Sequence, residues 1–401
     1  MVFFSSCRLS PNVCSTVLII ARNQLGKQLV PDVKLQVRNV STKTMRHRVV
    51  SEPKPAPFPY KDKRYNFWRA LFDSTEDRLD ENSKLIVVEG LPAAGKHQLA
   101  KGLADELDMV YFPSPTQAET FINDYGFNLK TLDPQLPESC QSYDETDFLK
   151  DPTRMSGLKA GRFQLMKYQL RFQRHMDALA HILNTGQGVV MDRSPYSDFV
   201  YITAMAEQGI VSKRIEQFYH KVRDNSLLTL WKPHLVIYLD VPVPEIRRRI
   251  ETRNRPHEKD SIATSQAYLE SLDKAYKNIF LKDISVHSEV MVYDWTEGGD
   301  SEIVAEDVER IDFDQYTPLD KKLEDWRRID KWDWNAHRYT FTHDQNQLYL
   351  HTCYPGTSCP EIVIAPEEYR VYERIISNAP GNKYEKGFNA DMGDKGLLFK
   401  L

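Results

Sequence analysis

The chain has 401 residues, of which 27 % are charged, and a formal net charge of −4. This length suffices for one or two domains with a large core, and the near balance of charge favours neither a nucleic-acid-binding nor a disordered protein. Five cysteines form no C-x-x-C pair and no metal-ligand spacing, so we expect a reducing compartment and no metal site.

The first 40 residues differ in charge from the rest of the chain. No Asp or Glu precedes Asp32, whereas Arg8, Arg22 and Lys27 lie among Ser and apolar residues. This composition is typical of a mitochondrial transit peptide, with a disordered basic tail as the alternative. Removal of residues 1–40 would leave 48 basic and 56 acidic residues, a net charge of −8. We therefore expect an acidic mature chain in mitochondria.

An N-terminal arm, residues 41–83, precedes a region in which strand and helix patterns alternate. The arm contains a proline-rich stretch at 52–60 that favours an extended backbone. Short apolar segments predict strands at 85–89, 109–112, 188–192, 235–240 and 289–294. Amphipathic patterns predict helices at 95–107, 158–184, 196–208, 212–229, 243–253 and 264–281. Such alternation predicts an α/β fold, a parallel sheet with helices on both faces, interrupted by a long insert at 113–157.

The C-terminal extension, residues 313–401, lies outside this alternation and is rich in aromatic and charged residues. Trp and other aromatic residues are enriched at the centres of protein interfaces, so we expect arm and extension to dock on a partner. The alternative is that their aromatic side chains cover the chain's own core. The residues concerned are Phe67, Trp68, Trp326, Trp332 and Trp334.

The stretch GLPAAGK, residues 90–96, has the pattern of a phosphate-binding loop. Gly90 and Gly95 allow the backbone N–H groups to face inward, and Lys96 would reach phosphate oxygens at the positive end of the next helix. An ordinary strand–turn–helix is the alternative. His97 stands where such loops place a hydroxyl for Mg²⁺, and neutral imidazole is a poor ligand for this hard cation.

Two further segments place charge near the same predicted sheet edge. One follows the third strand, where ligands bind in open α/β sheets, and the other runs from a helix into a proline-containing loop, as suits a lid over phosphates. The alternative for the first segment is a charged strand end with a capping residue, and the alternative for the second is a helix end exposed to solvent. The residues concerned are Asp192, Arg193 and Asp198 in the first segment and Arg249, Arg253 and Arg255 in the second.

Together these motifs resemble the deoxyribonucleoside kinase family, which has a five-stranded parallel sheet, a P-loop, an acid-Arg-Ser triplet and an arginine-rich lid. The resemblance implies a kinase-like domain over residues 84–312 with two groups of site residues. Nucleotide binding would fall to Gly90, Gly95, Lys96, Arg193, Arg249, Arg253 and Arg255. The nucleoside pocket would be formed by Gln164, Arg171, Asp192, Asp198 and Glu258.

One departure from the family bears on catalysis. Active members place a glutamate after the second strand as base for the sugar 5′-hydroxyl, whereas Ser114 or a neighbouring proline stands there in this chain. A serine hydroxyl cannot be tuned as a general base near neutral pH, and such a loss typically costs about 10²–10⁴ in rate. Together with His97 this indicates a pseudo-kinase, with Asp192 or Glu119 as the remaining candidates for a base.

The runs at 185–201, 233–250 and 393–401 resemble a branch of this family that serves as accessory subunits of mitochondrial complex I, NADH:ubiquinone oxidoreductase. The resemblance implies a subunit peripheral to the matrix side of the inner membrane, bound to other complex I subunits, with no nucleic-acid partner and no redox chemistry of its own. No cofactor is expected to be essential, although a purine nucleotide is expected in the pocket, with FAD as another ligand left open. The alternative function is an active mitochondrial deoxyribonucleoside kinase.

Overall fold

The computed structural model describes residues 40–46, 54–317, 319–328, 330–355 and 358–395. Residues 1–39 of the predicted transit peptide lie outside these ranges. Val40, the last residue of that predicted segment, is buried against the hydrophobic core. The side chain of Asn82 bonds the backbone of Ser41, accepting from its N–H at 2.8 Å and donating to its carbonyl at 2.7 Å. Residue 40 is therefore packed as part of the folded domain.

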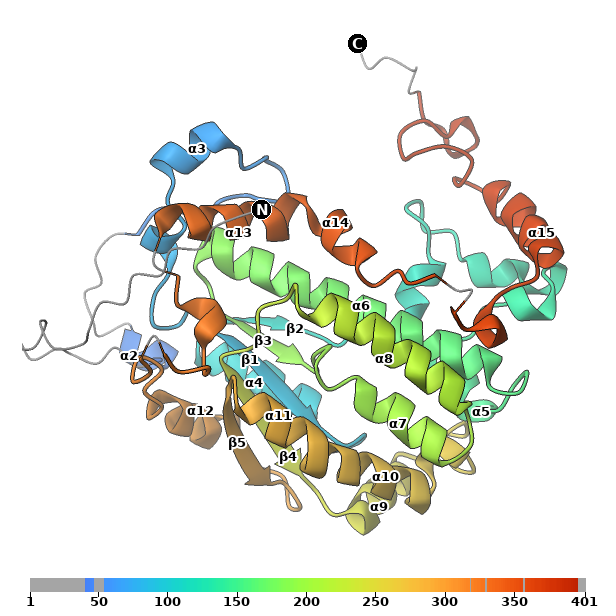
Figure 1. Ribbon diagram of the computed structural model, residues 1–401, viewed down its shortest axis with the longest axis horizontal. Helices are drawn as coiled ribbons and strands as arrows, with labels where there is room; N and C mark the ends of the chain where they lie inside the picture. The colour runs from blue at the N-terminus through green and yellow to red at the C-terminus, as the bar shows by residue number, and fades with distance from the viewer. Residues whose placement is uncertain (1–39, 47–53, 318, 329, 356–357, 396–401) are drawn as a thin grey trace, which may run out of the picture. The chain divides into compact units, whose positions relative to one another are not determined.

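A parallel sheet forms the centre of the described chain (Figure 1), and its strands follow the order β2-β3-β1-β4-β5. The strands are β1 (Leu85–Gly90), β2 (Val110–Phe112), β3 (Val189–Asp192), β4 (Leu235–Asp240) and β5 (Glu289–Asp294). Every residue of β1 is buried, as expected of a central strand in a sheet covered on both faces. The predicted α/β fold with a five-stranded parallel sheet is confirmed.

Helices cover both faces of this sheet (Figure 1). They are α4 (Lys96–Glu106), α6 (Leu158–Thr185), α7 (Phe199–Glu207), α8 (Lys213–Leu227), α9 (Val243–Arg253), α10 (Gln266–Ala275), α11 (Leu281–Ser285) and α12 (Ser301–Glu309). The helix predicted at 264–281 is interrupted by a π-helical segment, Tyr276–Phe280. The sequence analysis did not predict α12. Across the described ranges, none of the helices combines the length and the apolar character needed to cross a bilayer.

The insert at 113–157 and the end of the chain pack against each other. The insert holds the helix α5 (Glu145–Lys150) among short 3₁₀ turns, and α15 (Pro366–Ser377) lies beside it. The Ser139 hydroxyl donates to the Glu368 carboxylate at 2.6 Å. The C-terminal extension is thus joined to the kinase-like region by side-chain contacts as well as by the chain.

The remaining terminal helices are α2 (Lys43–Arg46), α3 (Phe67–Phe72), α13 (Lys331–His343) and α14 (Gln345–Leu350). The aromatic residues of the arm and the C-terminal extension divide into two groups. The ring of Trp231 packs against Trp326 at 5.0 Å and Trp334 at 5.6 Å between centroids, so both tryptophans cover the chain's own core, as the alternative reading held. Phe67, Trp68 and Trp332 stay exposed.

Candidate functional site

A cavity of about 630 Å³ lies between the loop after β1, the end of β3 and the helix α9. Its lining includes seven of the residues predicted to bind a nucleotide or nucleoside: Gly95, Lys96, Asp192, Arg193, Arg249, Arg253 and Glu258. It also includes Arg248, which the sequence analysis did not single out, and His97 and Ser114. The lining therefore holds more basic than acidic side chains, which suits an anionic ligand.

The loop between β1 and α4 has the backbone that a phosphate-binding loop requires. Gly90 has φ +145°, and a Cβ added there would lie 2.8 Å from the carbonyl oxygen of Leu239. Gly95, with φ +100°, begins α4 in a conformation that side chains rarely adopt. The Nζ of Lys96 donates to the Leu91 carbonyl at 2.6 Å. Burial, with the neighbouring Arg193 guanidinium, lowers the pKa of Lys96 to about 7.

His97 and Ser114 are the two residues at which the sequence was found to depart from the pattern of the kinase family. The Nδ1 of His97 and the hydroxyl of Tyr111 share a hydrogen bond of 2.7 Å, so the imidazole is held toward β2. Ser114 lines the cavity at the place predicted for the catalytic base. Glu119 bonds the hydroxyl of Thr116 at 3.1 Å, pairs with Arg174 and lies outside the cavity lining. Ser114 thus places a hydroxyl in the cavity lining at the position where the resemblance predicted a base.

The turn after β3 brings Asp192 and Arg193 to the cavity. The Asp192 Oδ1 atom is buried and finds no hydrogen-bond partner among the described residues. Arg193 has φ +67°, its backbone N–H donates to the Val88 carbonyl at 3.1 Å, and its guanidinium lies 4.8 Å from the centroid of the Tyr201 ring. A left-handed residue that is not glycine at such a turn is typical of functional sites.

Glu89 supports this turn, and the sequence analysis missed it. The carboxylate is fully buried and accepts hydrogen bonds from the backbone N–H and the hydroxyl of Ser194, both at 2.9 Å. Tyr276 donates to its other oxygen at 3.3 Å. Burial raises the pKa of Glu89. Its signal in the sequence was a single acid in an otherwise apolar strand, directly before Gly90.

The predicted lid arginines fall into two groups that differ in their bonding partners. Arg249 donates to the carbonyl oxygens of Trp295 and Thr296, both at 2.8 Å, and of Ala94 at 3.2 Å, so it ties α9 to the phosphate-binding loop. Farther out, Arg253 and Arg255 form ion pairs with Glu258 at 3.5 and 3.4 Å. Arg253 lines the cavity, whereas Arg255 does not.

The three residues expected to recognise a base lie together, as predicted, but they bond one another. Gln164 donates to Asp198 at 2.7 Å, Arg171 forms an ion pair with the same carboxylate, and Tyr219 donates to it at 2.7 Å. Gln164, Arg171 and Asp198 are buried and lie outside the cavity lining. The predicted nucleoside residues are therefore divided: Asp192 and Glu258 line the open cavity, whereas the polar groups of Gln164, Arg171 and Asp198 bond one another.

Metal ligands do not gather in the part of the chain that the structure describes. No group of three or more His, Cys, Asp or Glu side chains has the arrangement of a metal site there.

Comparisons with known proteins give a consistent set of relatives. A model of the deoxynucleoside kinase family matches residues 86–326. NADH dehydrogenase [ubiquinone] 1 alpha subcomplex subunit 10 of Bos taurus is 33 % identical over 82 % of this chain and 91 % of its own length, and that of Mus musculus is 35 % identical over 84 % and 90 %. A deoxyguanosine kinase of Dictyostelium discoideum is 28 % identical over 60 % of this chain and 74 % of its own. A deoxyadenosine kinase structure from M. mycoides covers 56 % of this chain and 96 % of its own, with a TM-score of 0.41 and 20 % identity.

Proposed function

The chain belongs to the deoxynucleoside kinase family, and we propose that it acts as a non-catalytic accessory subunit of mitochondrial complex I. The extent of the matches carries this proposal. The subunits named alpha subcomplex subunit 10 match over 331 residues in cattle and 340 in mouse, whereas the Dictyostelium deoxyguanosine kinase matches over 240. The greater extent supports the function of these subunits over the alternative, an active deoxyribonucleoside kinase.

The candidate site supports the absence of catalysis. Ser114 lines the cavity where kinases of this family need a base. His97 shares a hydrogen bond with Tyr111, and its imidazole has no oxygen to offer to Mg²⁺. Of the two acids in the lining, Glu258 pairs with Arg253 and Arg255, which leaves Asp192 as the remaining candidate for a base. A general base must reach the proton that it takes in a suitable pose of the substrate, so the proposed absence of catalysis rests on Ser114 and His97.

The proposed place of the subunit is the matrix side of the inner membrane, where it would bind other complex I subunits and support their assembly or stability. The acid-poor segment 1–40 supports import into mitochondria, and the net charge of −8 that remains without it argues against a nucleic-acid partner. Under this proposal the chain carries out no redox chemistry.

The open cavity supports a structural ligand that carries phosphate. Five basic side chains supply positive charge to the cavity: Lys96, Arg193, Arg248, Arg249 and Arg253. The N-terminal end of α4 is directed toward the same space. A purine nucleotide is the ligand we propose, and FAD is the other ligand that this charge would suit. Such a ligand would stabilise the folded subunit by mass action.

Co-migration tests the proposal. We expect the tagged full-length chain, imported into mitochondria and released with mild detergent, to run on a native gel with the band that oxidises NADH. Migration as a small species, together with ATP-dependent phosphorylation of deoxynucleosides by the purified chain, would favour the kinase instead.

A further inference from the structure

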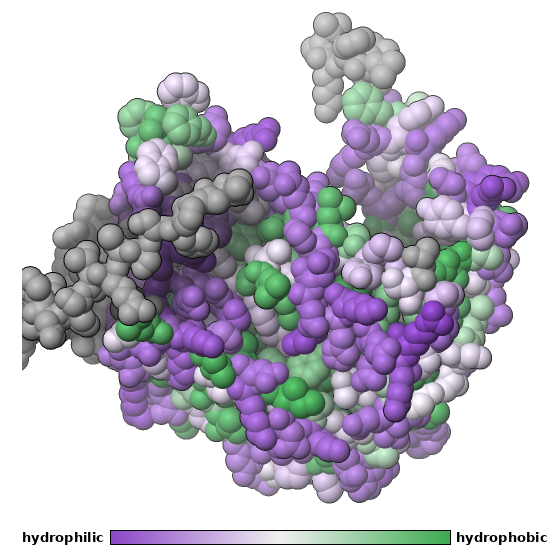
Figure 2. Space-filling model, in the orientation of Figure 1, coloured by the Kyte–Doolittle hydropathy of each residue, from purple (hydrophilic) through white to green (hydrophobic). Residues whose placement is uncertain are grey.

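A group of exposed apolar side chains gathers on the short helix α3 and on the start of α13. The aromatic platform, as we name it, consists of Phe67, Trp68, Leu71 and Phe72 of α3 and Trp332 of α13. Phe72 is 91 % exposed, Trp68 71 % and Phe67 64 %. Figure 2 shows apolar side chains gathered over α3.

Three rings of the platform, those of Phe67, Trp68 and Trp332, contact one another across elements that are far apart in the sequence. Phe67 stacks on Trp332 with 6.1 Å between ring centroids and 12° between planes. Trp68 meets the same phenyl ring edge-on at 5.7 Å. The platform is therefore a composite surface, which forms only where α3 and α13 are held together.

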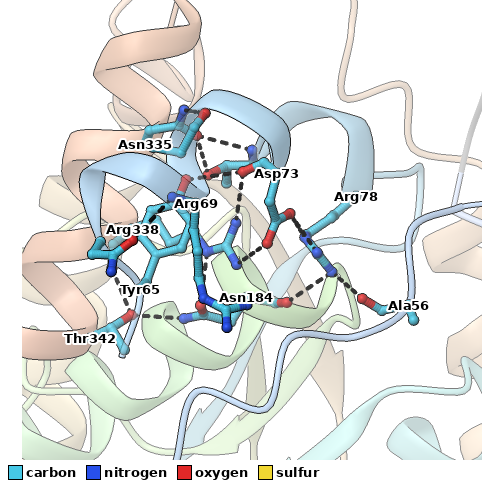
Figure 3. Close-up of polar contacts among 12 residues, drawn as sticks. Ala56, Tyr65, Arg69, Asp73, Arg78, Asn184, Asn335, Arg338 and Thr342 are labelled. Carbon is cyan, nitrogen blue, oxygen red and sulfur yellow. Dashed lines mark hydrogen bonds and ion pairs between the residues drawn. The ribbon is translucent and has the colours of Figure 1, made fainter. Parts of the chain in front are cut away.

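Buried polar contacts hold α3 against α13 (Figure 3). The Asn335 amide oxygen accepts hydrogen bonds from the backbone and the hydroxyl of Thr75 at 3.1 and 2.8 Å, and its amide nitrogen donates to the Ala70 carbonyl at 3.3 Å. One turn along α13, the fully buried Arg338 donates to Asp73 at 3.1 Å and to Asn184 of α6 at 2.8 Å. Both Ala70 and Asp73 lie at the end of α3, so this helix is fixed directly beneath its exposed rings.

The size and rigidity of the platform are those of the centre of a protein interface. Its four rings expose roughly 500–600 Å². That area reaches the largest apolar patch expected on a monomer, and it fits the apolar centre of an interface that buries about 800 Å² on each partner. Fixed aromatic side chains lose little conformational entropy on binding, which is why such residues dominate binding energies.

The charges that flank the platform favour a protein over a lipid surface as the occupant. Exposed Lys61, Asp62, Lys63 and Arg64 precede α3, exposed Arg69 lies within it, and exposed Glu76 and Asp77 follow it, so both signs are present. An anionic membrane attracts a patch of one sign, whereas a protein groove can match both signs at its rim. We propose that the aromatic platform docks into an apolar groove, rimmed by charges of both signs, on another protein subunit of the assembly.

This inference rests on the proposed function, and crosslinking from the platform tests it separately. The photoreactive amino acid p-benzoylphenylalanine replaces Trp68 in the full-length chain in mitochondria, and Tyr384, which is 59 % exposed, is replaced as the control. A second arm compares the double variant Trp68→Ser/Phe72→Ser with Leu228→Ser, whose side chain is 90 % exposed elsewhere. Melting temperatures of the purified variants show that each still folds.

We expect position 68, and not position 384, to crosslink to another protein within the native complex band. We also expect the double variant to lower the complex-bound fraction by about tenfold, with Leu228→Ser bound as the wild type. An adduct with lipid or with a second copy of the chain, or a double variant that folds and binds normally, would overturn the inference. A wild-type chain that leaves complex I but crosslinks from position 68 to a protein in another stable assembly would refute the proposed function and keep the inference. A chain that migrates alone would refute both.

Discussion

Replacing Arg338 with methionine tests whether the C-terminal extension is part of the fold. Arg338 lies on α13 and is fully buried, and it joins the end of α3 to the end of α6 through Asp73 and Asn184. Its guanidinium also lies 3.8 Å from the centroid of the Tyr65 ring. Methionine has a similar length and fills most of the same space, so Arg338→Met removes the polar contacts and the charge while it leaves most of the packing.

The size of the effect follows from these contacts. Removal of one partner from a buried ion pair costs about 3–5 kcal/mol, because the other charge is left without compensation. Asp73 keeps a second partner, since Arg78 donates to it at 2.9 Å, and it is partly exposed to water. We therefore expect Arg338→Met to lower the free energy of unfolding by about 2–4 kcal/mol, less than for an isolated pair. The melting temperature should fall by roughly 3–6 °C, because the unfolding entropy of a chain of this size is large.

Urea denaturation followed by circular dichroism and tryptophan fluorescence measures this change. The matched control is Arg310→Met, because Arg310 forms ion pairs with Glu306 and Asp307 at the surface, where its side chain is 72 % exposed. Surface pairs of this kind contribute little, so the control should change stability by less than about 0.5 kcal/mol. Equal midpoints for Arg338→Met and the wild type would refute the view that this network joins the arm and the extension to the core.

Four further predictions concern the site and the N-terminus. Purified chain with ATP, Mg²⁺ and each deoxynucleoside should show no phosphorylation above background; activity that Lys96→Ala removes would mean that Ser114 does not mark a lost base. Millimolar ATP or ADP should raise the melting temperature of the wild type, and that shift, measured for each protein against its own apo form, should be absent in Lys96→Ala/Arg193→Ala. Because the pKa of Lys96 is about 7, its amine is mostly neutral at pH 8, and bound phosphate favours the charged form. Nucleotide binding at pH 8 should therefore take up close to one proton per chain, visible as a buffer-dependent binding enthalpy that Lys96→Met abolishes. Finally, the mature N-terminus from mitochondria should lie close to the buried Val40, and a mature chain that starts at Met1 would contradict the predicted transit peptide.

The strands and the phosphate-binding loop could be predicted because their signals are local. Short runs of β-branched residues predict strand ends to within one residue, and the spacing of Gly90, Gly95 and Lys96 indicates the loop directly. Arg248 was missed because one face of a helix rich in arginines cannot be chosen from spacing alone. Both Arg248 and its neighbour Arg249 line the cavity, but Arg249 donates to backbone carbonyls, whereas Arg248 forms an ion pair with Glu245.

Contacts between distant segments account for what the sequence did not predict. A buried acid such as Glu89 is recognised only once Ser194 and Tyr276 are seen to satisfy it. In the same way, Gln164, Arg171 and Asp198 can either bind a base or bond one another, and only the folded chain distinguishes the two. The aromatic residues of the arm and the extension likewise divide into core and surface by tertiary packing, which composition does not reveal.

Depletion of the chain from mitochondria is the most direct test of the central claim that a kinase fold acts here as a structural subunit. Two activities are measured in the same mitochondria: NADH:ubiquinone oxidoreductase activity in the membranes and deoxynucleoside phosphorylation in the matrix extract. We expect the oxidoreductase activity to fall together with the amount of assembled complex I, while deoxynucleoside phosphorylation stays unchanged. Loss of phosphorylation with complex I activity intact would contradict the claim.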